Sequence, residues 1–151
     1  MKMICKFLIV ILFFSIATVY ADTIRDPGLE AAIKRKLYNS NPSWPIPVED
    51  LEELTELSAR AKGIVDLTGL EYCTNLEELN LEENKITDLS PLSQLVNLKM
   101  LYLNDNQITD ISPLVLNSGL SKVDLTGNPL SRDSIKVYIP ELKLSRVNVV
   151  R

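Results

Sequence analysis

The acidic side chains are the residues whose type and spacing come closest to supporting catalysis. They include two adjacent pairs, Glu77-Glu78 and Glu82-Glu83. A pair of carboxyl groups performs general acid–base chemistry only where an apolar pocket raises the pKa of one of them. Both pairs fall where we expect a flat, exposed strand and turn, so both carboxyl groups of each pair should stay ionised.

Other catalytic chemistry is excluded by composition. The chain contains no histidine, so a histidine-based triad, a zincin site and a histidine general base are all excluded. It contains five glycines and no glycine-rich phosphate loop. The segment Asn104-Asp105-Asn106 is similar to the start of a calcium loop but lacks the later acidic, glycine and glutamate positions. We therefore predict a protein that is not an enzyme and has no cofactor and no metal.

Residues 1–21 are typical of a secretory signal peptide. Lys2 and Lys6 precede an uncharged apolar run, which ends at Val19-Tyr20-Ala21 with residues suited to cleavage. A retained membrane anchor is the alternative, but the run is short for a span, which needs about 20 apolar residues. We predict cleavage and export to the periplasm, the cell surface or the medium, without membrane association afterwards.

The mature chain is acidic. The whole chain has a net charge of −4, and the signal segment carries two lysines and no acidic residue. No basic patch with interleaved aromatic residues is present, so nucleic acid is excluded as a partner. Only Cys73 remains after cleavage, which excludes an internal disulfide. Stability must therefore come from packing.

A 22-residue repeat dominates the sequence. Residues 76–92, LEELNLEENKITDLSPL, align with residues 98–114, LKMLYLNDNQITDISPL, and agree at every Leu or Ile position. Less regular units lie in phase on either side, which gives four units over residues 53–140. Such units stack because none can bury its apolar face alone.

Each unit predicts a short strand followed by a bend. The L-x-L alternation places both leucines on one face, and stacked units then form a parallel sheet over a leucine core. Asn84, Asn106 and Asn128 follow the strands, and we expect them to form an asparagine ladder that bonds backbone groups at the bend. Lys62 occupies this position in the first unit, so the ladder should start in the second.

The segment 22–52 is predicted to be a helical N-terminal cap. Asp26-Pro27 is a helix start, because aspartate caps the first N–H groups and proline fits the first helical position. A second short helix is expected over 48–53. A solenoid needs caps because its terminal turns expose apolar core.

The segment 131–151 is predicted to be a C-terminal cap that overlaps the last repeat. It contains an expected helix over 133–144, with Pro140 as its weak point, and a final strand over 147–150. With caps at both ends, we expect the chain to form a complete domain.

At three positions the residue type differs from that at the equivalent position of another unit. Cys73 aligns with Leu95 and should face the core as a small apolar residue. Gly119 replaces the asparagine of earlier units, and Asn117 stands where a leucine stood. We therefore expect looser packing in the return leg around residues 115–118.

The pattern L-x-x-L-x-L-x-x-N-x-[IL] resembles the leucine-rich repeat, and the I-T-D-[LI]-S-P-L tail is similar to the short bacterial internalin-like class. The resemblance covers the repeats and the helical segment before them. It implies an α/β solenoid: a short arc with a parallel β-sheet on its concave face, a helical N-terminal cap and a helix-strand C-terminal cap. Members of this family bind proteins with the concave face.

The residues between the inward leucines form that face. Met100 and Tyr102 are central, and tyrosine and methionine are enriched in interface cores. Acidic residues flank them, and the alternative is a face that merely keeps the protein soluble. The expected binding residues are Glu78, Asn80, Glu82, Met100, Tyr102, Asn104, Lys122 and Asp124.

We predict an exported, monomeric binding module that recognises another protein, from a host or from its own cell envelope. The alternative is a structural or accessory subunit that self-associates or assembles in the envelope. Self-association of the pure protein would separate the two hypotheses.

Overall fold

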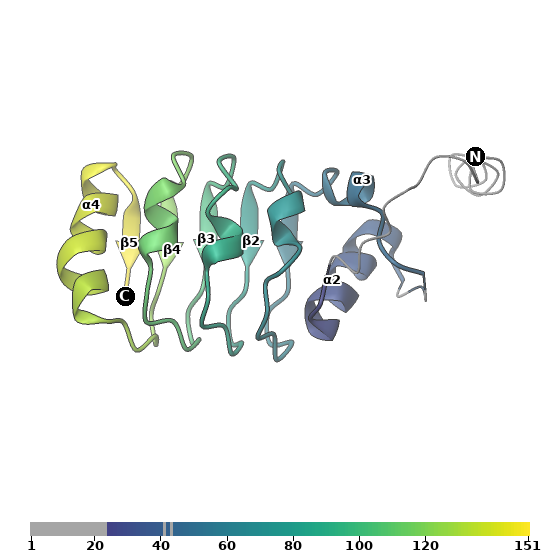
Figure 1. Cartoon of the computed structure of the whole chain (residues 1–151), viewed down its shortest axis with the longest axis horizontal. Coiled ribbons are helices and arrows are strands. Elements are labelled where there is room, and N and C mark those ends of the chain that lie inside the picture. The colour runs from purple at the N-terminus through teal and green to yellow at the C-terminus, as the bar shows by residue number, and fades with distance from the viewer. Residues whose placement is uncertain (1–23, 41, 43) are drawn as a thin grey trace.

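The computed structural model describes residues 24–40, 42 and 44–151, so the signal-peptide prediction lies outside the described residues. Successive turns of the chain stack along one axis (Figure 1). Each contributes one strand to a parallel sheet in the order β1-β2-β3-β4-β5. The strands are β1 (Glu56–Ser58), β2 (Glu78–Asn80), β3 (Met100–Tyr102), β4 (Lys122–Asp124) and β5 (Asn148–Val150).

The middle residue of each strand points into a continuous apolar core. Leu57, Leu79, Leu101 and Val123 are aligned across the sheet and are all buried. The residues on either side of them point outward, as strand alternation requires. We call the surface that these outward residues form the concave face. This arrangement confirms the predicted α/β solenoid with a parallel sheet.

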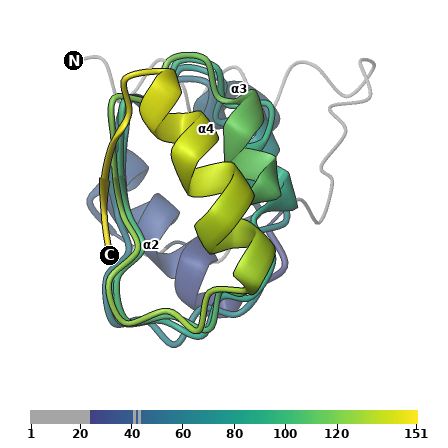
Figure 2. The ribbon, with the colours of Figure 1, turned by 90° about the vertical axis from the view of Figure 1, so that its left-hand side faces the viewer.

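Short 3₁₀ helices form the opposite side of each turn (Figure 2). An aspartate starts them: the Asp88 carboxylate accepts hydrogen bonds from the Ser90 N–H at 2.8 Å and the Ser90 hydroxyl at 2.6 Å. In two of the three helices a proline, Pro91 or Pro113, then occupies the first turn, where no N–H is needed. These helices are η1 (Leu70–Tyr72), η2 (Ser90–Leu92) and η3 (Ser112–Leu116).

The asparagine side chains join neighbouring turns. Asn106 Nδ2 donates to the carbonyls of Leu81 (2.9 Å) and Leu103 (3.0 Å), and its Oδ1 accepts the Ile86 N–H (3.0 Å). Equivalent bonds occur one repeat earlier and one repeat later, at Asn84 and Asn128. Each carboxamide therefore satisfies backbone groups of its own turn and of the preceding one.

Asp26 connects the helix α2 (Pro27–Tyr38) to the first repeat. One carboxylate oxygen caps the helix by accepting the Gly28 and Leu29 N–H groups, at 2.9 and 3.1 Å. The other accepts the Val65 N–H at 2.9 Å. A Cβ atom at Gly28 would lie 2.6 Å from a backbone carbonyl oxygen of the first repeat, so only glycine permits this close approach.

α2 lies beside β1 at one edge of the sheet (Figure 1). It buries Leu29 and Ile33 in the common core. The helix α3 (Val48–Leu51) follows and is shorter than the expected 48–53. An edge strand exposes unpaired backbone groups, and a neighbouring helix reduces access to them.

The expected helix over 133–144 is present, and its backbone hydrogen bonding changes just before Pro140, the predicted weak point. A π-helical turn, η4 (Ser134–Tyr138), precedes α4 (Ile139–Leu144). Pro140 lacks an N–H, and in an α-helix its ring would collide with the carbonyl four residues earlier. The wider turn, in which the Ile139 N–H donates to the Ser134 carbonyl, relieves that collision.

The looser packing expected around residues 115–118 is not found at Asn117. Asn117 is buried, and its Nδ2 donates to the carbonyls of Leu92 (2.8 Å) and Leu95 (3.0 Å). A Cβ atom at Gly119 would lie 2.2 Å from the Val96 carbonyl oxygen. These substitutions fasten the fourth unit closely to the third, and the strand register continues unchanged.

Cys73 is fully buried in the core, and burial raises the pKa of its thiol to about 12. The thiolate is the reactive form, so we expect the native protein to resist a thiol reagent at neutral pH. The measurement uses the Cys5→Ser variant, in which Cys73 is the remaining thiol, with and without guanidinium. Reaction should be rapid only in guanidinium; equal rates in both solvents would place Cys73 outside the core.

Candidate binding surface

The predicted site residues lie together on the concave face. Glu78, Met100 and Lys122 occupy one row across β2, β3 and β4. A second row contains Asn80, Tyr102 and Asp124. Glu82 and Asn104 continue the alternation beyond the strand ends, where backbone hydrogen bonds still join successive turns.

Sequence reasoning missed two residues of these rows. Asn148 and Val150 of β5 extend them past Lys122 and Asp124. β5 follows β4 after 26 residues, outside the 22-residue spacing that defined the columns. The strand pattern around Val149, with an inward residue between two outward ones, could have placed Asn148 and Val150 on the concave face.

Three half-buried side chains form the centre of the face, and we call them the Met100–Tyr102–Lys122 cluster. The Tyr102 hydroxyl donates to Met100 Sδ at 3.9 Å, a long and weak contact. Lys122 Nζ lies 4.7 Å from the centroid of the Tyr102 ring, within cation–π range. These contacts place the three side chains next to one another on the face.

Other predicted site residues are already engaged within the protein. The Glu82 carboxylate pairs with the Arg60 guanidinium at 2.9 Å. Asp124 accepts hydrogen bonds from the N–H (3.0 Å) and hydroxyl (2.7 Å) of Thr126, and Asn80 Oδ1 accepts the Glu82 N–H at 3.0 Å. These polar groups hold the chain where each strand ends, so they are less available to a partner than the central cluster.

The electrostatics of the face do not favour acid–base catalysis. Hydrogen bonding and the positive charge of Lys36 lower the pKa of the Glu56 carboxyl group. A catalytic acid needs the opposite shift, toward a raised carboxyl pKa. Among the described residues, no group of three or more acidic or cysteine side chains is placed to hold a metal ion.

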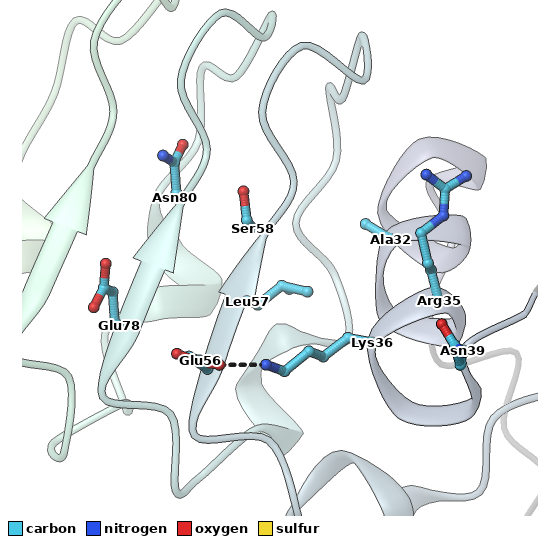
Figure 3. A pocket seen from close by; sticks show the side chains of 9 residues that line it. All are labelled: Ala32, Arg35, Lys36, Asn39, Glu56, Leu57, Ser58, Glu78 and Asn80. Carbon is cyan, nitrogen blue, oxygen red and sulfur yellow. Dashed lines mark hydrogen bonds and ion pairs between the residues drawn. The ribbon is translucent and has the colours of Figure 1, made fainter.

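A groove of about 700 Å³ lies between α2 and the first two strands (Figure 3). α2 and the residue that caps its C-terminus, Asn39, supply one wall, and residues of β1 and β2 supply the other. An ion pair between Lys36 and Glu56 bridges the two walls. The lining residues are Ala32, Arg35, Lys36, Asn39, Glu56, Leu57, Ser58, Glu78 and Asn80.

The groove was not predicted from the sequence. Repeat spacing fixes how strands align with one another, but it says nothing about how a preceding helix packs against them. Of its lining residues, Glu78 and Asn80 were predicted as concave-face residues, whereas nothing in the repeat pattern singled out Arg35 or Lys36.

The sequence profile described as leucine-rich repeats (2 copies) matches residues 52–94 and 96–137. These segments include more than half of the chain, and they coincide with the stacked turns. The chain therefore belongs to the leucine-rich-repeat family.

Solved structures place it more closely within that family. An internalin (InlF) from Listeria monocytogenes is 32% identical over 91% of this chain and 39% of its own, with a TM-score of 0.77. Internalin C2 of the same species is 30% identical over 90% of this chain and 59% of its own, with a TM-score of 0.76. A leucine-rich-repeat protein of Leptospira interrogans is 27% identical over 72% of this chain and 28% of its own, with a TM-score of 0.60. None of the curated protein sequences matches the chain significantly.

The chain is an internalin-like leucine-rich-repeat protein, as its motifs predicted. It spans less than two thirds of the length of either internalin. The fold is a protein-interaction scaffold and not an enzyme family, which confirms the prediction that the chain is not an enzyme. Within the described residues, no helix is both long and apolar enough to cross a membrane.

Proposed function

We propose that the chain is an exported binding module that recognises another protein through its concave face. The observation that supports this most strongly is the Met100–Tyr102–Lys122 cluster. It combines an apolar, an amphipathic and a cationic side chain at the middle of the sheet, half-buried and already in contact with one another.

Met100 and Tyr102 match the core of a protein interface, whereas the charged Lys122 matches its rim. Interface cores are depleted in charge and enriched in aromatic residues and methionine, whereas their rims are polar. Here Glu78, Asn80, Asn104 and Asp124 surround the cluster on neighbouring positions. A rim of this kind excludes water from a few central contacts, which then supply most of the binding energy.

Export is part of the proposal and rests on the signal-peptide pattern of residues 1–21. The mature chain then consists of a helical cap over 22–52, repeats over 53–140 and an overlapping cap over 131–151, acting as a monomer. Its partner is a protein met beyond the cytoplasm, either from a host or in the cell's own envelope.

A photo-crosslinking residue at position 102 tests the site. The chain is recovered from the exported fraction, where its N-terminal sequence checks cleavage after Ala21. A matched chain carries the crosslinker at Leu116, an exposed residue of the 3₁₀ helix η3 and not of the sheet. One dominant adduct at position 102 alone, competed by unmodified protein, supports the proposal. Adducts of the chain with itself would instead support an accessory role in assembly.

The Tyr102→Ala variant should bind the captured protein about 30-fold more weakly, because a central tyrosine contributes about 2 kcal/mol or more in such interfaces. Its melting temperature should change little, since the ring is outside the buried core. The affinity is measured by calorimetry, with Val96→Ala on an exposed position as control. Unchanged affinity of Tyr102→Ala would move the binding site away from the central cluster.

A further inference from the structure

The groove beside α2 presents unpaired charges of opposite sign on its two walls. Arg35 lies on the α2 wall and Glu78 on the β2 wall (Figure 3). Within the described part of the chain, neither side chain has an ion pair or a hydrogen bond. The other two charged residues of the groove, Lys36 and Glu56, already pair with each other.

This distribution of charge selects among ligand classes. The lining contains two cations and two anions, so the groove has no excess charge to attract a polyanion or a polycation. None of the lining residues is aromatic, so the groove offers no ring on which a nucleobase could stack. A ligand that carries both signs, separated along its length, complements both walls.

The uncharged groups of the groove suit a polypeptide backbone. Ala32 and Leu57 lie between the walls (Figure 3), but both are buried and offer a ligand little apolar surface. The Ser58 hydroxyl has no hydrogen-bond partner among the described residues, and Asn80 uses its Oδ1 internally, which leaves its Nδ2 to donate. A backbone carbonyl of an extended peptide could accept from either group.

We infer that this groove is a docking subsite for a short polypeptide segment that carries one acidic and one basic side chain. The acidic side chain pairs with Arg35, and the basic side chain pairs with Glu78. The inference rests on the proposed function and deepens it, because the groove adjoins the concave face through the residues Glu78 and Asn80. The protein partner would thus contact α2 as well as the sheet.

Three capped synthetic peptides test the subsite without knowledge of the partner. The mixed peptide is acetyl-Ser-Glu-Gly-Gly-Lys-Ser-amide; in the other two, glutamine replaces either the glutamate or the lysine. Each is titrated into the isotope-labelled chain, and the backbone amide signals of Ser58 and Asn80 are followed by NMR. The mixed peptide should shift both signals at millimolar concentration, and each glutamine peptide should bind about threefold to fivefold more weakly, as expected for one solvent-accessible ion pair.

Charge-removing variants assign each pairing. In Arg35→Gln, replacement of the peptide's glutamate should no longer matter, whereas replacement of its lysine should still weaken binding. In Glu78→Gln, replacement of the peptide's lysine should no longer matter, whereas replacement of its glutamate should still weaken binding. Arg132→Gln, which removes an exposed arginine at the other end of the chain, should behave as the unaltered protein. Absence of shifts at Ser58 and Asn80, or shifts that do not depend on peptide charge, would overturn the inference.

The same titration with Tyr102→Ala separates this inference from the proposed function. Peptide binding should survive that substitution, because Tyr102 does not line the groove. Peptide binding without a crosslinked partner at position 102 would retain the groove and reject the central site. A crosslinked partner without charge-dependent peptide binding would retain the central site and reject the groove.

Discussion

The Leu103→Asp variant should lack a cooperative folded state at room temperature. Leu103 is fully buried in the core that neighbouring turns share. Truncating a buried leucine costs about 2–5 kcal/mol, and a buried unpaired carboxylate costs several kcal/mol more. A domain has only about 5–15 kcal/mol of net stability. Far-UV circular dichroism during heating should therefore show no sharp transition.

Leu116→Asp is the matched control for this variant. The Leu116 side chain is 63% exposed, although it lies within the same repeated architecture. Its free energy of unfolding should stay within about 0.5 kcal/mol of the unaltered protein. A normal melting transition in Leu103→Asp would show that Leu103 does not face the core and that the register of the repeats is wrong.

The Asn106→Ala variant should fold but lose about 2–4 kcal/mol of stability. The missing carboxamide leaves the Ile86 N–H and the carbonyls of Leu81 and Leu103 without these partners. Each unsatisfied buried polar group costs about 1–3 kcal/mol, although local relaxation recovers part of the total. The melting temperature, measured by calorimetry, should fall by about 10 °C.

Asn104→Ala provides the comparison, because Asn104 lies on the same turn but outside the core. Its Nδ2 donates only to the neighbouring Asp105, at 3.3 Å. Stability should change by no more than about 0.5 kcal/mol. If both alanine variants lost the same stability, the bonds between turns at Asn106 would contribute nothing beyond the loss of an asparagine side chain.

The sequence predicted the repeated part of the fold because one periodicity determines several levels of structure. A spacing of 22 residues aligns the strands, and the L-x-L alternation within each strand decides which side chains are buried. The concave rows follow from the same two facts. A reader of the sequence could therefore place Met100, Tyr102 and Lys122 on one face without knowing any coordinate.

The contacts between the N-terminal helix and the repeats, including the groove, depend on packing that no local sequence pattern encodes. Asp26 was recognisable as a helix cap, but its second carboxylate oxygen bonds to Val65, 39 residues away. The α2 wall of the groove likewise depends on the position of the helix beside β1. Arg35 therefore became a candidate contact residue only once that position was known.

The two proposed contact points for a partner lie on different turns of the solenoid. The number of turns between them therefore sets the distance between them. The groove lies at β1 and β2, whereas the central cluster lies on β3 and β4. Neighbouring strands are about 4.8 Å apart, and each turn contacts only its neighbours. Insertion of one unit between β2 and β3 would therefore increase the distance between the two contact points by one strand spacing while leaving both intact. Repeat number would then set which partner geometry the face accepts, and relatives could change partners by recombination alone.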